Sequence, residues 1–231
     1  MVAMSKELFN GFPKESIKFF ADLAFNNNKK WFNDHKKDYE QYIMKPSRAF
    51  VIEMGERLQE LSSDINAIPV VNKSLFRVNR DTRFSKDKSP YKTNLGILFW
   101  EGDRKRMECP GFYFHSEADK LMLADGIHIF PKDLLERFRK VVIDNKSGNE
   151  LLDIVRTLGN DKLKVSGEYY KRVPQGYDPN HSNSNYLKFN GLYTMFETKI
   201  PKEFYSNKLI DYCFDNYKKM FPLHKWIVNY L

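Results

Sequence analysis

Apolar residues in the first sixty positions recur every three or four residues, which is the spacing of a helix with one buried face. Pro13 suits the first turn of such a helix, and Asn28 is placed to cap the next one. Pro46 is expected to end the second helix and to begin a third. The pattern therefore predicts a helical layer over about 13–62, with helices at about 13–27, 29–44 and 46–61.

Beyond residue 70 the pattern changes to short runs of β-branched and aromatic residues, which favour strands. Polar links at Ser116–Asp119 and Asp125–Gly126 are typical of turns. Consecutive strands with short links imply an antiparallel sheet, over about 70–130. The predicted strands are 70–71, 75–78, 95–100, 111–115, 120–124 and 127–130.

Helical spacing returns after Pro131, and further helices are predicted around 151–158 and from Pro201 to Pro222. The stretch 159–190 is rich in Gly, Asn, Ser and Pro, which predicts a long ordered loop with short strands. A loop of this length is usually functional or covers another part of the protein.

These segments together predict an α+β fold in a single domain, 1–231. N-terminal helices would precede a central, mostly antiparallel sheet covered by helices. The C-terminal helices and the long loop would occupy 131–231. A hydrophobic content of 42% and an aromatic content of 15% supply a sizeable core and exclude disorder over the bulk of the chain.

Positive charge is concentrated in the middle of the chain. The formal net charge is +8, and the segment from Lys73 to Arg106 carries ten basic residues against four acidic ones, a local net of +6. Such a field favours anionic partners, such as phosphates or nucleic acid. The alternative is that these charges pair internally or only keep the protein soluble.

The cysteines and the N-terminus indicate the compartment. Cys109 and Cys213 are far apart and lack metal-type spacing, so a reducing compartment is expected. Residues 1–7 show no apolar signal region, and no apolar run reaches the roughly 20 residues that span a bilayer. We therefore expect a soluble cytoplasmic protein with no membrane partner.

The stretch from Arg77 to Lys92 holds six cationic side chains and two carboxylates in sixteen residues. If 75–80 is a strand, its arginines point to both faces, which is costly unless one face is wet or paired. Arg supplies bidentate forks and Lys supplies point charges, so the stretch is a candidate site for a phosphate or carboxylate ligand. The predicted contacts are Arg77, Arg80, Arg83, Lys86, Lys88 and Lys92.

Asp81 and Asp87 have two possible roles in this stretch. They could orient the cations around a ligand, with Phe84 and Tyr91 anchoring the loop by packing. Alternatively they could form an internal salt-bridge lattice that holds the loop to the helical layer. Lys171, Arg172, His181 and Lys188 of the long loop are predicted to complete a basic cleft.

The same stretch resembles the signature R-x-x-R-D-x-R-F-x-x-D-K-x-P-Y-K of the family known as domain of unknown function 2461. The run stands intact from Arg77 to Lys92, and family-like pieces flank it. These are Asn28–Lys36 with Tyr39, Gly111–His115, and Pro174–Tyr177 with His181 and Leu187–Lys188. The resemblance covers nearly the whole chain, and it implies neither a substrate nor a catalytic residue.

Other chemistry is weakly represented. Asp81 and His181 are the candidates for a catalytic acid or base, but no nucleotide-binding loop or nucleophile motif accompanies them. The histidines lack metal-ligand spacing, and no cofactor is indicated. Trp31, Phe32 and their helical neighbours are more typical of core than of a base-stacking platform, and Cys109 of a buried inert thiol.

Three functions remain open. The first is a module that binds a small anionic ligand through the basic stretch. The second is an enzyme acting on a phosphate-containing substrate. The third is a nucleic-acid-associated or protein-interaction factor, for which charge is the only signal.

Overall fold

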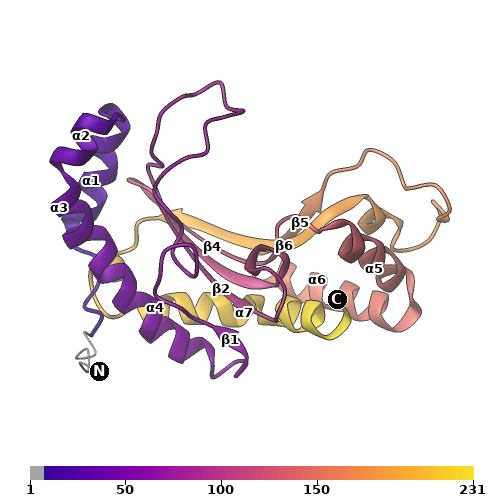
Figure 1. The fold of residues 1–231 in the computed structure, drawn as a ribbon. Helices are drawn as coiled ribbons and strands as arrows, with labels where there is room; N and C mark the ends of the chain where they lie inside the picture. The colour runs from indigo at the N-terminus through magenta and orange to yellow at the C-terminus, as the bar shows by residue number, and fades with distance from the viewer. Residues whose placement is uncertain (1–7) are drawn as a thin grey trace. The chain divides into compact units, whose positions relative to one another are not determined.

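The computed structural model describes residues 8–231 as an α+β protein that contains helices and a six-stranded sheet (Figure 1). The fold class agrees with the prediction. The prediction of no signal region at residues 1–7 falls outside the described residues.

The N-terminal helices are α1 (Lys14–Phe25), α2 (Lys29–Asp34), α3 (Lys36–Asp38) and α4 (Lys45–Leu58), with a π-helix at Tyr39–Met44. The later helices are α5 (Lys132–Ile143), α6 (Asn145–Asn160) and α7 (Leu209–Tyr230). Short 3-10 turns lie at Arg106–Glu108, Ser184–Lys188 and Lys202–Tyr205. The strands are β1 (Ile65–Asn66), β2 (Leu95–Glu101), β3 (Gly111–Ser116), β4 (Lys120–Ile127), β5 (Lys164–Glu168) and β6 (Phe189–Lys199).

The strand order in the sheet is β1-β2-β3-β4-β6-β5. The predicted meander of β2, β3 and β4 is present. The sheet also contains β5 and β6, which lie beyond the predicted sheet boundary at residue 130. We predicted short strands for the β5 region, but we missed the eleven residues of β6.

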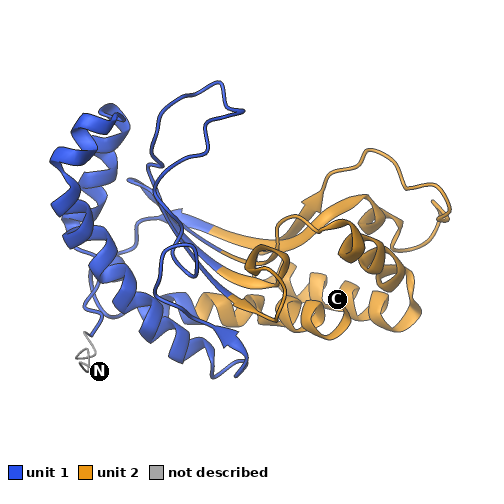
Figure 2. Ribbon diagram, in the orientation of Figure 1, with its two compact units in different colours: residues 1–99, 113–123, 197–214 blue, residues 100–112, 124–196, 215–231 orange. Residues whose placement is uncertain are grey.

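The chain divides into two compact units (Figure 2). Unit 1 contains residues 1–99, 113–123 and 197–214, and unit 2 contains residues 100–112, 124–196 and 215–231. Strands β2, β3, β4 and β6 contribute residues to both units. The prediction of a single domain remains a prediction.

The core of unit 1 is aromatic, as the composition suggested. The ring of Phe50 lies 5.2 Å from that of Phe9 and 4.8 Å from that of Phe114. Phe12 stacks on Phe204 with 5.0 Å between ring centroids. Because all five side chains are buried, this cluster joins the N-terminal segment to α4 and the sheet.

The N-terminal helices begin close to where the sequence predicted. Asn28 caps α2 by accepting a hydrogen bond from the Trp31 N–H at 3.0 Å. Pro46, however, does not end a helix, because the π-helix leads directly into α4. The wider π turn accommodates a residue that lacks an N–H, and Ser47 satisfies the Ile43 carbonyl from its own hydroxyl at 2.6 Å.

Two helix predictions in unit 2 are also wrong at their ends. Helix α6 begins at Asn145, because the Asp144 side chain caps it by accepting hydrogen bonds from two backbone N–H groups. Helix α7 continues past Pro222. A proline inside a helix destabilises it by about 3 kcal/mol. Burial of the Trp226 and Ile227 side chains beyond Pro222 stabilises the helix by about 1.5–3 kcal/mol each, which offsets that loss.

The predicted turn at Asp125–Gly126 lies inside β4. Buried and half-buried residues alternate along this strand, and Asp125 occupies an inward position. The pattern was misread because an aspartate at that position looks like a break. Burial is possible here because His224 pairs with the carboxylate.

Candidate functional site

The basic stretch Arg77–Lys92 forms a long loop in unit 1, between β1 and β2 (Figure 1). The predicted strands at 70–71 and 75–78 are absent, and isolated bridges replace them, including an antiparallel one between Asn79 and Tyr91. The Arg80 N–H donates to the Pro90 carbonyl at 2.9 Å, and the Lys92 N–H donates to the Val78 carbonyl at 2.8 Å. These bonds hold the two ends of the loop together, and we call the paired residues 78–80 and 90–92 its neck. Residues 81–89 form the part of the loop beyond the neck.

The neck is attached to the N-terminal helices. The Asn27 side chain accepts from the Tyr91 N–H at 3.0 Å and donates to the Tyr91 carbonyl at 2.9 Å. The Tyr91 ring stacks on Phe32 with 4.1 Å between centroids. Phe32 and Tyr91 are buried, which supports the interpretation of the α2 aromatics as core. Phe84 does not anchor the loop, because 95% of it is exposed.

Both carboxylates of the loop pair with arginines of the same loop. Arg80 binds Asp87 and also donates to the Ser89 carbonyl at 3.3 Å. Arg83 holds Asp81 with two hydrogen bonds, of 3.0 and 2.7 Å. The lattice alternative expected these acids to tie the loop to the helical layer, and Asn27 makes that connection instead.

The remaining four cations lie at or near the surface. Lys88 donates to the Thr82 carbonyl at 2.8 Å, and the Lys92 ammonium lies 5.3 Å from the centre of the Phe76 ring. Arg77 and Lys86 are exposed. All six predicted contacts belong to this loop, and two of them, Arg80 and Arg83, pair with its own carboxylates.

Asp81 and Asp87 remain ionised at neutral pH. Hydrogen bonds from the Ser89 hydroxyl and backbone, together with one from Arg80, hold the pKa of Asp87 well below its usual range. The Arg83 side chain and backbone lower the pKa of Asp81. A carboxylate with a lowered pKa is a poor proton donor or acceptor near pH 7, so this environment argues against Asp81 as a catalytic acid or base.

The other catalytic candidate, His181, belongs to unit 2, as do Lys171, Arg172 and Lys188. Its Nδ1 accepts a hydrogen bond from the Asn183 N–H at 3.1 Å, which fits a local loop role. The basic cleft that these residues were expected to complete remains a prediction.

Sequence reasoning missed a buried charged cluster in unit 2. His224 lies between Asp125, 2.7 Å from its Nδ1, and Glu101, 3.0 Å from its Nε2. The Phe112 ring stacks on the imidazole at 4.5 Å. Burial alone would lower the pKa of His224, but the attraction and hydrogen bonds of the two carboxylates raise it to about 9. Because His224 follows Pro222, which we took as the end of a helix, no pattern in the sequence indicated a partner for it.

His115 of β3 is hydrogen-bonded, with its Nε2 2.9 Å from Glu117 Oε1. Cys109 is buried, and burial raises the pKa of its thiol, in agreement with an inert residue.

Within residues 8–231, no group of three or more His, Cys, Asp or Glu side chains is arranged to hold a metal ion. In the same part of the chain, none of the helices has the length and apolar character needed to cross a membrane.

Comparison with known proteins gives a family. No curated protein matches the chain. One family model matches residues 15–226, which is nearly the whole sequence and includes the loop, its neck and the helices that anchor it. The chain therefore belongs to the family described as "Conserved hypothetical protein (DUF2461)".

Proposed function

We propose that the protein binds a phosphate- or carboxylate-bearing small molecule through the loop Arg77–Lys92. The observation that carries this proposal is the charge balance of the loop. The loop carries six cationic side chains and two carboxylates, a net charge of +4 within sixteen residues. This excess of positive charge favours an anionic partner.

The loop ion pairs are exposed, which suits ligand exchange. The Arg80 and Asp87 side chains are 27% and 60% exposed, and those of Arg83 and Asp81 are 77% and 44% exposed. Pairs that water can reach are weak and rearrange readily. A multiply charged anion can therefore recruit Arg83 while Arg80 continues to brace the loop through Ser89 and Ser85.

The attachment of the neck to Asn27 favours a loop that binds a ligand over a loop whose charges only keep the protein soluble. Ordering a loop on binding costs conformational entropy, and the Asn27 and Tyr91 attachments meet part of that cost in advance. Only the segment between the neck residues needs to adjust around a ligand.

Titration calorimetry with tripolyphosphate tests the proposal. The double variant Arg77→Ala and Lys86→Ala removes two exposed cations, so it should leave folding intact and weaken binding about tenfold or more. The double variant Lys29→Ala and Lys30→Ala makes the same charge change on exposed positions of α2 and should bind nearly as the wild type.

Two outcomes would contradict the proposal. Equal weakening by both double variants would mean that tripolyphosphate responds only to overall charge. Tight binding of a single-stranded DNA oligonucleotide, falling about a thousandfold or more between about 50 and 200 mM salt, would favour the nucleic-acid alternative if tripolyphosphate did not bind.

A further inference from the structure

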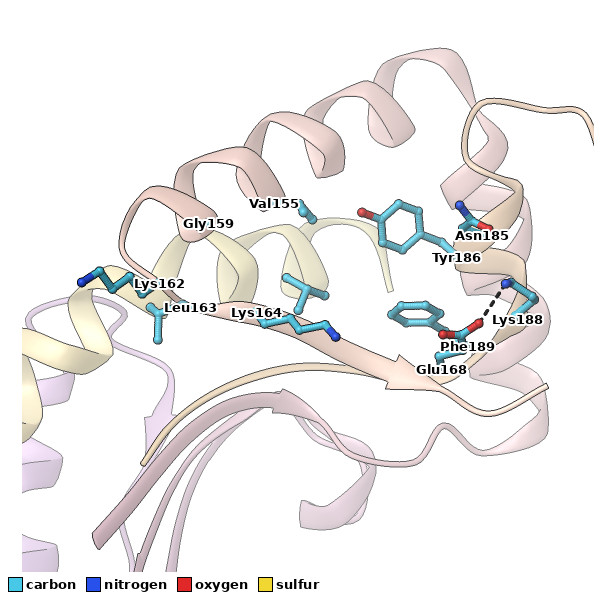
Figure 3. Close-up of a pocket in the computed structure, with 11 residues that line it drawn as sticks. Val155, Gly159, Lys162, Leu163, Lys164, Glu168, Asn185, Tyr186, Lys188 and Phe189 are labelled. Carbon is cyan, nitrogen blue, oxygen red and sulfur yellow. Dashed lines mark ion pairs between the residues drawn. The ribbon is translucent and has the colours of Figure 1, made fainter. Parts of the chain in front are cut away.

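Unit 2 contains an open groove of about 640 Å³ that is separate in sequence from the basic loop. Helix α6, strand β5 and the 3-10 turn Ser184–Lys188 supply its lining (Figure 3). The volume falls within the roughly 300–1,000 Å³ of sites that bind small molecules. Its charged and aromatic lining residues are Lys162, Lys164, Glu168, Tyr186, Lys188 and Phe189.

The charged residues of the groove favour an anion. Three lysines face one glutamate, which leaves a net charge of +2. Lys188 binds Glu168 at 2.8 Å, and this bond, followed by the charge of Lys164, lowers the pKa of Glu168. The Lys188 ammonium group is therefore already paired with Glu168, which leaves Lys164 and Lys162 as the other basic groups of the groove. Figure 3 shows the Lys164 side chain extending from β5 toward Phe189 and Glu168, whereas Lys162 points away from the rings.

Two aromatic rings line the same groove as Lys164. The ring centroids of Tyr186 and Phe189 are 5.2 Å apart at an angle of 57°. Tyr186 is only partly buried, and its hydroxyl points across the groove toward Val155 (Figure 3). Burial raises the pKa of Tyr186, so the hydroxyl stays protonated and can donate a hydrogen bond. A flat ring can pack against these side chains while its acidic substituent meets Lys164.

The backbone of β5 departs from regular pairing next to these side chains. Ser166 pairs with Tyr193, whereas Glu168 pairs with Phe189, so the register shifts between them. Gly167 has φ +133°, and a Cβ there would overlap the Gly191 carbonyl oxygen. Irregularities of this kind re-aim side chains and are frequent at binding sites. Here the shift sets Glu168 opposite Phe189, within reach of Lys188.

We propose that this groove is a second binding site, for a small molecule that joins a flat ring to a phosphate or carboxylate. Lys164 binds the acidic group, Tyr186 and Phe189 contact the ring, and the Lys188–Glu168 pair closes one end of the groove. The site is independent of the loop Arg77–Lys92.

Calorimetric titration with four probes tests this site. Adenosine monophosphate and indole-3-acetate each carry a ring and an acidic group, whereas adenosine lacks the anion and inorganic phosphate lacks the ring. At least one of the first two should bind about tenfold or more tightly than both partial probes. The stronger of the two identifies phosphate or carboxylate as the acidic group.

Substitutions then place the ligand in the groove. Lys164→Ala removes an exposed strand side chain and should weaken the stronger probe about tenfold. Lys199→Ala removes an exposed lysine from β6, outside the groove, and should have no effect. Circular dichroism melting verifies that both variants fold.

The same variants distinguish this site from the loop. Arg77→Ala with Lys86→Ala should leave the Lys164-dependent binding of the ring-bearing probe unaffected, and Lys164→Ala should leave tripolyphosphate binding at the loop unaffected. Failure of both ring-bearing anions to bind at millimolar concentration would overturn the groove proposal. Inorganic phosphate that binds as tightly as the ring-bearing probe and is weakened equally by Lys164→Ala would overturn it as well, as would equal effects of Lys164→Ala and Lys199→Ala.

Discussion

Lys162 has a left-handed backbone conformation, with φ 61°. It follows α6 at the position where a helix usually ends in glycine. The Lys162 N–H donates to the Gly159 carbonyl at 3.0 Å, and the Leu163 N–H donates to the Leu158 carbonyl at 2.9 Å. This hydrogen-bond pattern is a Schellman motif, and a residue with a Cβ is strained in it. The positive charge offsets part of that strain, because cations interact favourably with helix C-termini.

Replacing Lys162 with Gly should therefore stabilise the protein by about 1 kcal/mol, since relief of the strain outweighs loss of the exposed charge. Chemical denaturation measures the change in unfolding free energy. Asn72 offers a matched control, because it also has a left-handed conformation, with φ 67°. Asparagine tolerates this region well, so Asn72→Gly should change the stability by only a few tenths of a kcal/mol. Equal effects at the two sites would contradict the strain argument.

Strand β5 depends on one glycine, Gly167. It lies at the edge of the sheet and pairs with β6 alone among the described strands. Gly167 allows the two backbones to approach where the register shifts. Because β5 supplies Lys164 and Glu168, its pairing also sets the geometry of the groove.

Gly167→Ala should destabilise the protein by about 2–3 kcal/mol, because alanine resists the positive φ and its Cβ meets backbone. Gly159→Ala is the matched control in α6, where an added Cβ meets nothing within 4 Å. In that helix, alanine should stabilise the protein by about 0.5–1 kcal/mol. Thermal unfolding of both variants checks the opposite signs, and a neutral Gly167→Ala would refute the close approach.

The sequence predicted elements whose side chains follow a regular period. Helices α1 and α5 were identified because their apolar residues recur at the helical spacing, and strands β2 and β3 because they are runs rich in β-branched and aromatic residues. The prediction was wrong where tertiary contacts override a local signal. Pro222 would end an isolated helix, and Asp125 would interrupt an isolated strand, but buried partners compensate both.

The sequence located the candidate loop, but it did not predict how the loop is held in place. Charge and motif identified Arg77–Lys92, whereas the role of Asn27 depends on a partner sixty-four positions away. The same limit applies to the groove, since α6, β5 and a 3-10 turn converge only in the fold. The sequence was enough to identify charged groups within one segment. A site built from several segments could be identified only from the structure.

The interior of the molecule contains a charged histidine, His224, between two carboxylates. The chain has a formal net charge of +8 with its histidines neutral, and a protonated His224 adds a buried positive charge. Complete burial raises the pKa of Asp125, and the adjacent His224 counteracts part of that rise. Losing the His224 proton would leave Asp125 and Glu101 close together with no cation between them, which is unfavourable in a buried site.

The folded-state pKa of His224, about 9, lies above the value of 6.5 expected in the unfolded chain. The folded protein therefore binds this proton more tightly, and the stabilisation is fully present below pH 6.5 and is lost as the pH rises through 9. We expect a loss on the order of 3 kcal/mol, measured by urea denaturation at a series of pH values. Asp125→Asn removes one of the two carboxylates, so it should lower the stability at pH 6.5 and flatten the profile between these limits. A variant profile as steep as that of the wild type would assign the pH dependence to other groups.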